Sequence, residues 1–211
     1  MCLRYAFTTT GYKTLMERFS LETVPEDMVP RYNIAPTQQV PVIFNDAEKA
    51  LLSARWGIES GHSAHPFFNA RAETIDSKPS FKKDFAERRC LIPADTFYEW
   101  KQPEKWPFRV FLKSNEIFAF AGIYRIGEER SCCMVTVDAN SLVSRIHNRM
   151  PAILPLRKEK EYLEAGAEEA KAMLRPFPAE MMGMYEIPSD VNSARNDSPG
   201  LWNRKKSLFD Y

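Results

Sequence analysis

Short strand-like runs, interrupted unevenly by a few helices, are the feature of this sequence that most constrains its fold. Each run combines apolar residues with β-branched or aromatic ones and is bounded by polar or proline-containing turns. The runs lie at 39–44, 50–56, 90–93, 97–100, 108–112, 117–124, 132–138 and 183–187. Many strands with few helices between them are typical of an α+β fold with a mainly antiparallel sheet or barrel.

Apolar residues also recur at helical spacing in a few segments. The predicted helices cover 12–21, 79–88, 156–164 and 167–174. No internal repeat, low-complexity tract or linker divides the 211 residues. We therefore expect a single domain over 1–211, in which the polar end, 197–211, forms a flexible tail.

The charge balance excludes a bulk electrostatic attraction for nucleic acid, because 29 Lys and Arg face 28 Asp and Glu and leave a net charge of +1. Any affinity for DNA must come from local clusters of cations. The four cysteines, at 2, 90, 132 and 133, form no C-x-x-C pair, and the chain has 3 histidines. We therefore expect neither a metal site nor another cofactor.

Cysteine usage of this kind fits a reducing compartment. The sequence has neither a secretory signal nor an apolar run of the ~20 residues that span a bilayer. We expect a cytoplasmic location, associated with the nucleoid if the source is prokaryotic, and no membrane partner.

The N-terminus carries the first chemical motif. Aminopeptidases remove Met1 efficiently when the second residue is small, and Cys2 is small. The mature chain would then begin with a 1,2-aminothiol, whose amine has an ordinary pKa of about 7.7–8.0 and whose thiol has one of about 8.5. The amine can attack an aldehyde to give a Schiff base, and the thiol can close a thiazolidine ring. The alternative is that Cys2 is an incidental residue of the first strand.

The run 69–74 combines an amide, a cation and a carboxylate. On a helix, Asn69 and Glu73 would share a face. Asn69 could hold a nucleophile by hydrogen bonds, and Arg71 could bind a phosphate through two hydrogen bonds. The alternative is a capped surface helix.

Two further residues are candidates for acid–base chemistry. Glu99 lies between Tyr98 and Trp100, and shielding by these rings would raise its pKa toward that of a general acid. His147 has arginines on both sides, which favour its neutral form. The alternatives are a solvent-facing strand glutamate and a structural or exposed loop histidine. His62 and His65 lie in a polar stretch and are interpreted as incidental.

A phosphate-binding face is indicated by arginines that fall within or beside these motifs, while the acidic helices from 156 to 174 lie outside them. The arginines are Arg4, Arg55, Arg71, Arg145 and Arg149. Trp56 could stack on a base, which contributes ~1–3 kcal/mol, or it could be a core residue.

Taken together, the motifs resemble those of the SRAP family, the SOS-response-associated peptidase or abasic-site-processing proteins. The matching pieces appear in family order between residue 1 and about 155. They are Met1-Cys2-x-Arg4, Asn33-x-Ala35-Pro36, Trp56-Gly57, Asn69-Ala70-Arg71-x-Glu73-Thr74, Arg89 to Ala94 with Phe97-Tyr98-Glu99-Trp100, and His147-x-Arg149-Met150-Pro151. The resemblance implies a compact α+β domain around a curved, barrel-like sheet.

The resemblance also implies residue roles. Cys2 would be the nucleophile that crosslinks to an opened abasic sugar, Asn69 would position it, and Glu99 and His147 would be the acid–base pair. The implied DNA contacts are Arg4, Asn33, Pro36, Arg55, Trp56, Arg71, Thr136 and Arg149. The chain departs from the family pattern at Leu3 and Thr96, where glycine is usual, and at Arg55, where some members carry a second tryptophan.

The expected function is that of an abasic-site sensor, which forms a covalent thiazolidine crosslink with single-stranded DNA and shields the lesion. Weak lyase activity and self-removal of Met1 would accompany it. The expected partner is single-stranded DNA with abasic sites, including junctions with duplex, and the expected state is a monomer. Two alternatives remain open, an N-terminal-nucleophile cysteine peptidase and a non-enzymatic module that binds single-stranded DNA.

Overall fold

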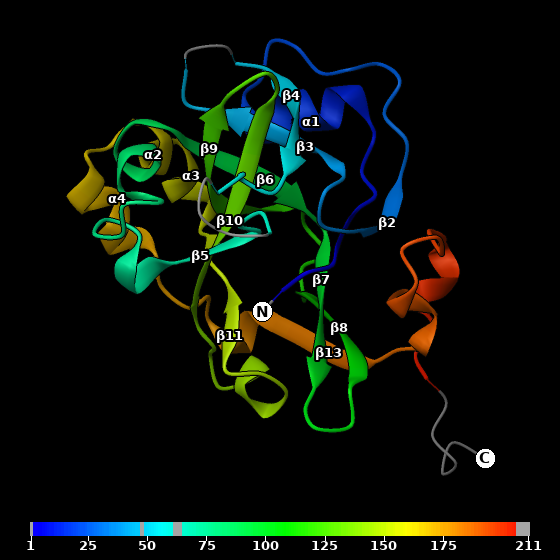
Figure 1. Ribbon diagram of the computed structural model, residues 1–211. Coiled ribbons are helices and arrows are strands. Elements are labelled where there is room, and N and C mark those ends of the chain that lie inside the picture. Colours follow the sequence, from blue (N-terminus) through cyan, green and yellow to red (C-terminus); the bar gives the residue numbers. More distant parts are fainter. Residues whose placement is uncertain (1, 47–48, 61–64, 206–211) are drawn as a thin grey trace.

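Two β-sheets form the framework of the molecule in a computed structural model, which describes residues 2–46, 49–60 and 65–205 (Figure 1). The smaller sheet has 5 strands. In spatial order they are β13 (Met182–Glu186), β8 (Trp106–Leu112), β7 (Thr96–Lys101), β1 (Tyr5–Phe7) and β2 (Arg31–Ile34). All neighbouring strands in this sheet are antiparallel.

The larger sheet has 8 strands and curls into a barrel. In order they are β11 (Arg149–Pro151), β10 (Arg130–Asp138), β4 (Leu51–Trp56), β3 (Gln39–Phe44), β6 (Arg89–Ala94), β9 (Phe118–Ile126) and β12 (Ile153–Leu154), with β5 (Asn69–Arg71) paired to β10. Strand β10 pairs with both β4 and β9, which closes a ring of five strands. The expected barrel-like, mainly antiparallel α+β fold is confirmed.

Close packing in the barrel wall depends on a glycine in β9. A Cβ atom added at Gly122 would lie 2.8 Å from Cys90 Sγ and 3.3 Å from the Cys133 carbonyl oxygen. Any side chain here would therefore push neighbouring strands apart. Tyr5 of β1 joins the two sheets, since its ring meets Trp56 at 5.5 Å and Phe120 at 5.7 Å between centroids, edge to face.

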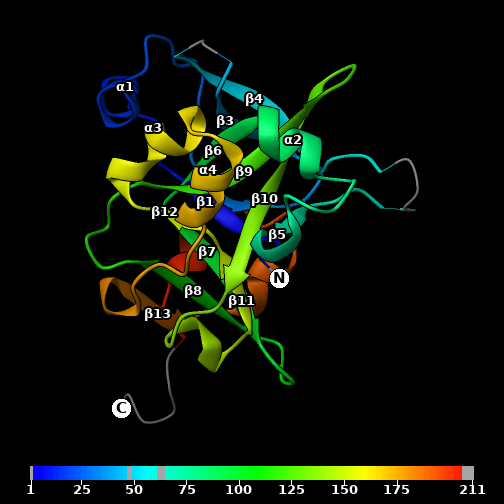
Figure 2. The ribbon, with the colours of Figure 1, turned by 90° about the vertical axis from the view of Figure 1, so that its left-hand side faces the viewer.

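Four α-helices cover the barrel where the sequence predicts them. They are α1 (Tyr12–Phe19), α2 (Lys82–Glu87), α3 (Leu156–Glu164) and α4 (Ala167–Met173). Helices α2, α3 and α4 lie together on one side of the barrel (Figure 2). Arg18 of α1 binds the Glu159 carboxylate of α3 through two hydrogen bonds of 2.7 Å each. None of the helices in the described part of the chain is long and apolar enough to cross a membrane.

The structure differs from the sequence prediction in the segment 69–74. It is not one helix but strand β5 followed by a single 3₁₀ turn, Ala72–Thr74. Pairing with β10 decides this, because Asn69, Ala70 and Arg71 lie in parallel register with Met134, Val135 and Thr136. Backbone hydrogen bonds to a neighbouring strand outweigh a local helical pattern.

Part of the segment expected to form a flexible tail makes packed contacts over the residues that are described. Asp197 accepts hydrogen bonds from the backbone N–H groups of Tyr32 and Asn33 and forms an ion pair of 2.8 Å with Arg31. Leu201 is buried in a short 3₁₀ turn, Pro199–Trp202. The segment 197–205 is thus packed against β2 and β7. Residues 206–211 lie outside the described part.

Candidate active site at the N-terminus

The first residues of the chain are held against β7. The Tyr98 N–H donates to the Arg4 carbonyl oxygen at 3.0 Å, and the Cys2 thiol donates to the same oxygen at 3.3 Å. The Cys2 side chain is fully buried. Burial raises the pKa of the Cys2 thiol far above its ordinary value, and the negative charge of Glu99 raises it further. The thiol is therefore neutral as it stands, and a nearby base must take its proton before or as it reacts.

Asn69 fixes the terminus from the other side. Its Nδ2 donates to the Cys2 carbonyl oxygen at 3.0 Å, and the pairing of β5 with β10 sets its position. In Figure 1, β5 and β7 flank the start of the described chain. The Asn69 Oδ1 atom is buried and has no hydrogen-bond partner among the described residues. An unfilled acceptor beside Cys2 suits an incoming N–H or O–H group.

Glu99 is the carboxylate of the site. It lies on β7 and is 3% exposed. Burial raises the pKa of the Glu99 carboxyl above its ordinary value, although the charge on nearby His147 opposes the shift. The carboxyl therefore keeps its proton at a higher pH than an exposed glutamate does, as a general acid requires.

His147 faces Glu99 across a shared cavity of about 330 Å³. The Arg149 N–H donates to His147 Nδ1 at 3.0 Å. In the tautomer that accepts this hydrogen bond, the neutral ring carries its hydrogen on Nε2, whereas in the other tautomer Nδ1–H would donate to the Arg149 carbonyl oxygen at 3.2 Å. Both contacts fix the orientation of the ring, and the first tautomer can donate a proton or hydrogen bond from Nε2.

Arg149 anchors this loop. It is 8% exposed, and its guanidinium binds Glu73 at 2.7 Å, Asp138 at 2.6 Å and the Thr136 carbonyl oxygen at 2.7 Å. These partners hold in place the backbone that orients His147. A direct phosphate contact by Arg149, as the sequence suggests, would have to compete with both carboxylates.

Three other residues predicted to touch DNA are buried in this structure. Trp56 is 1% exposed, and its Nε1 donates to the Phe68 carbonyl oxygen at 2.9 Å, so no ring face is open to a base. Thr136 is fully buried in β10. The Asn33 Nδ2 group is buried and donates to backbone carbonyls of the C-terminal segment at 191, 193 and 196. These side chains build the scaffold of the site.

The remaining predicted contacts reach the surface. Arg71 is exposed and leaves β5 on the same face as Asn69, because side chains two residues apart on a strand share a face. Arg4 is half-buried and donates to the Asn192 carbonyl oxygen at 3.3 Å. Pro36 is also half-buried, and Arg55 pairs with Glu59 at 3.3 Å.

The cavity shared by Glu99 and His147 is also lined by residues that the sequence does not predict as site residues. Its lining consists of Glu99, Trp100, Gln102, Lys105, His147 and Asn192. Trp100 belongs to the Phe97–Trp100 motif, in which the sequence predicts it only as a shield for Glu99. Asn192 belongs to no motif, and it reaches the site because the C-terminal segment folds back, where it accepts a hydrogen bond of 2.8 Å from Trp100 Nε1.

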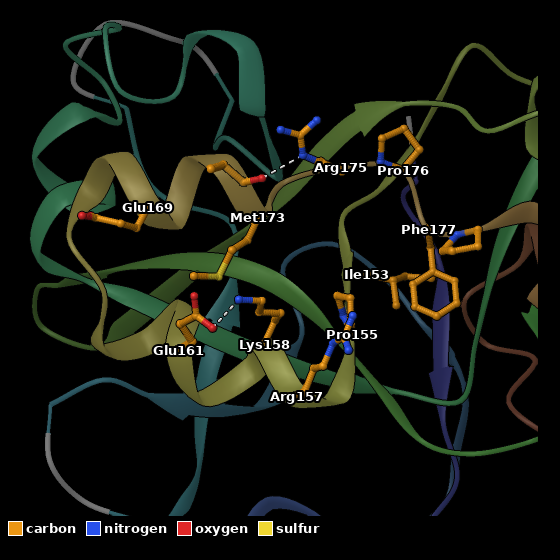
Figure 3. Close-up of a pocket in the computed structure, with 12 residues that line it drawn as sticks. Ile153, Pro155, Arg157, Lys158, Glu161, Glu169, Met173, Arg175, Pro176 and Phe177 are labelled. Atoms are coloured by element: carbon orange, nitrogen blue, oxygen red, sulfur yellow. Dashed lines mark hydrogen bonds and ion pairs between the residues drawn. The ribbon is translucent and has the colours of Figure 1, made fainter.

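A second cavity lies elsewhere and contains none of the predicted residues. Its volume is about 490 Å³, and it lies between α3, α4 and the segment that follows α4 (Figure 3). Ile153, Met173 and Phe177 supply its apolar lining. It is not the candidate active site, because no predicted acid, base or nucleophile reaches it.

The raised pKa of Glu99 predicts that its ionised form makes the folded protein less stable at neutral pH. A group whose pKa is raised by folding stabilises the fold below its unfolded pKa, and this contribution disappears as the pH rises through the folded pKa. Glu99→Gln should therefore be more resistant to unfolding than the wild type at neutral pH, with the difference shrinking toward about pH 4. Melting temperatures of both proteins across this range test it. A difference that does not vary with pH would contradict the assignment.

Comparison with known proteins finds similarity over most of the chain. The family model described as SOS response associated peptidase (SRAP) matches residues 1–194. A protein of Bacillus subtilis (strain 168), named abasic site processing protein YoqW, is 37% identical over 221 residues, which cover 95% of this chain and 98% of the relative.

More distant relatives retain the similarity. A Gallus gallus protein named abasic site processing protein HMCES is 30% identical over 219 residues, which cover 81% of this chain but 65% of the relative. A crystal structure of a protein from Bacteroides thetaiotaomicron superimposes with a TM-score of 0.82 at 26% identity, covering 97% of this chain and 100% of that one.

Proposed function

Because the chain belongs to the SOS response associated peptidase (SRAP) family, we propose that it processes abasic sites in single-stranded DNA by forming a covalent thiazolidine crosslink through Cys2, once Met1 has been removed. The observation that carries the proposal is the placement of Cys2. Asn69 holds its backbone, and Glu99 lies close enough for its charge to act on the thiol. Glu99 also shares a cavity with His147.

The reaction begins with opening of the abasic sugar, because only the open form carries an aldehyde. His147 Nε2–H donates a hydrogen bond to the ring oxygen O4′ as the C1′–O4′ bond breaks. The net transfer moves one proton from the C1′ hydroxyl to O4′ through water. The Asn69–Cys2 contact then keeps the terminal amine near the new C1′ aldehyde.

Glu99 serves both following steps. The Cys2 amine adds to C1′ to give a carbinolamine, and the Glu99 carboxyl protonates the hydroxyl, which leaves as water. An iminium and a Glu99 carboxylate remain. The thiol sulfur then adds to the iminium carbon while the carboxylate takes the thiol proton, which closes the thiazolidine and restores the carboxyl. If the ring does not close, the iminium can eliminate the 3′ phosphate, which is the proposed weak lyase activity.

The aldehyde requirement tests this proposal. The protein is mixed with an oligonucleotide containing an abasic site and, separately, with one containing a tetrahydrofuran analogue that has no C1′ hydroxyl and cannot open. We expect an adduct that survives denaturation with the first and none with the second. Equal adduct with both, or turnover of a peptide substrate without any DNA adduct, would contradict the proposal.

Binding of the intact strand should depend on salt despite the net charge of +1. Each phosphate neutralised on a single strand contributes about 0.7 to the slope of log K against log salt. Arg71→Ala should reduce that slope by about one such unit, because the exposed Arg71 side chain lies on the Asn69 face. Lys160→Ala is the matched control, since Lys160 is 84% exposed on α3, outside the proposed DNA face. Equal slopes for the wild type and Arg71→Ala would exclude Arg71 as a phosphate contact.

A further inference from the structure

An exposed tryptophan lies at the tip of the β7–β8 hairpin, beside the candidate active site. Trp106 is 44% exposed, whereas Trp56 is buried and the other two tryptophans are half-buried. In Figure 1 this hairpin projects from the lower part of the molecule. The residue before Trp106, Lys105, lines the cavity that contains Glu99 and His147, and an exposed tryptophan ring offers a face on which a base can stack.

Two lysines lie over this ring, and a third is its neighbour in the chain. The Nζ atoms of Lys101 and Lys205 each lie 5.4 Å from the ring centroid, and Lys105 precedes Trp106 in the chain. Glu186 holds Lys205 by two hydrogen bonds. The Glu186 carboxylate accepts from Lys205 Nζ, and the Glu186 carbonyl oxygen accepts from the Lys205 backbone N–H. Neither Lys101 nor Lys105 has a carboxylate partner among the described residues, although Glu104 belongs to the same turn. An aromatic ring with unpaired cations beside it matches a stacked base flanked by phosphates.

The hairpin register connects this ring to the reaction site. Lys101 pairs with Trp106 and Glu99 pairs with Phe108, so these four side chains leave the hairpin on one face. Trp106 precedes Phe108 by two residues, which places it about 7 Å closer to the hairpin tip along the strand. Lys105 lines the cavity that contains Glu99 and His147. If the abasic sugar of a DNA strand occupies that cavity, a neighbouring nucleotide of the same DNA strand would lie beside the Trp106 ring.

We propose that Trp106, with Lys101, Lys105 and Lys205, forms a stacking platform for an unpaired base that flanks the abasic site. The inference rests on the proposed function and adds a subsite to it. The ring stacks on the base, and the lysines contact the adjoining phosphates. Stacking on a ring face does not discriminate between bases, so the platform tolerates any sequence around the lesion. Lys205 lies beyond residues 1–194, so this subsite includes a residue outside the part matched by the family model.

The test compares Trp106→Ala, Trp106→Phe and the control Tyr12→Ala, which removes an exposed ring from α1. The dissociation constant is measured for an undamaged single-stranded oligonucleotide, and the rate of adduct formation is measured at saturating abasic oligonucleotide. Trp106→Ala should raise the dissociation constant about tenfold and leave the saturating rate unchanged. Trp106→Phe should restore most of the affinity, because it keeps a ring, and Tyr12→Ala should bind as the wild type does.

A second measurement assigns the effect to base stacking. An unreactive oligonucleotide with one tetrahydrofuran unit in place of the lesion is compared with one in which the nucleotides on either side are tetrahydrofuran units too, which removes those bases and keeps the phosphates. This change should weaken binding by the wild type but not by Trp106→Ala, because the two changes remove the same contact. The platform would be overturned if Trp106→Ala bound with wild-type affinity, or if the losses of affinity caused by the substitution and by removal of the bases were additive. Adduct formation by the wild type would still support the proposed function in either case. Absence of any wild-type adduct would instead reject the proposed function.

Discussion

Cys2→Ala is expected to abolish the DNA adduct that survives denaturation, with a loss of at least about a hundredfold, because no thiol remains to close the ring. The variant keeps a free amine, since alanine is also small enough for removal of Met1. It should therefore still form a Schiff base, which borohydride traps and which otherwise dissociates or eliminates the 3′ phosphate. Gel analysis with and without borohydride measures both species.

The matched control for this variant moves the thiol away from the terminal amine. Insertion of one alanine between Met1 and Cys2 gives a mature chain that still has an amine and a thiol, but no longer on the same residue. The five-membered ring cannot form, so this protein should behave as Cys2→Ala does. A stable adduct with either variant in the absence of reductant would identify a different nucleophile and refute the account.

Glu99→Gln is expected to slow adduct formation by about 10²–10⁴-fold, the usual contribution of a positioned acid or base. Glutamine keeps the shape and the buried position of Glu99, which is 3% exposed, but it cannot deliver or accept a proton. In the proposed mechanism both dehydration and ring closure lose their catalyst. Single-turnover rates at saturating abasic oligonucleotide measure the effect, because weaker binding cannot then contribute.

The pH dependence separates acid catalysis from a structural role of Glu99. Burial raises the pKa of Glu99, so its acid form persists to higher pH than usual and declines as the pH rises through that value. The terminal amine titrates in both proteins, and its effect cancels in the ratio of wild-type to Glu99→Gln rates. That ratio should fall from about pH 5 to about pH 8. A constant ratio, or equal rates throughout, would make Glu99 a structural partner of the terminus.

The longer strands and the four helices were predictable because each has a local pattern that its position in the fold also favours. The short strands β1, β2, β5, β11 and β12, of two to four residues each, were not predicted. Residues 156–164, for example, combine helical spacing with Tyr162, which is buried and donates to the Gly122 carbonyl oxygen of the barrel. Residues 69–74 have a helical pattern too, but β5 forms because an unpaired edge of β10 is available to it. No local pattern contains that information, since β10 lies about sixty residues further along the chain.

The chemistry of the candidate site was more predictable than its binding surface. Cys2, Asn69, Glu99 and His147, which the family resemblance groups together, are linked by contacts or a shared cavity in the structure, and their catalytic roles stay predictions. Which aromatic ring faces solvent was not predictable, because Trp56 ends one strand-like run and Trp106 lies just before another, and only the closed barrel determines which is buried. Asn192 lines the cavity because the C-terminal segment folds back across β7. No local sequence pattern predicts this tertiary contact.

The most direct test of the central claim is the intact mass of the adduct between the wild-type protein and an abasic oligonucleotide, recorded before and after borohydride. The account predicts the mass of the chain without Met1 plus that of the oligonucleotide, less one water. That mass should not change on reduction, because a thiazolidine has no C=N bond to reduce. An adduct that retains Met1, or one that gains two hydrogens on reduction, would contradict a thiazolidine at Cys2.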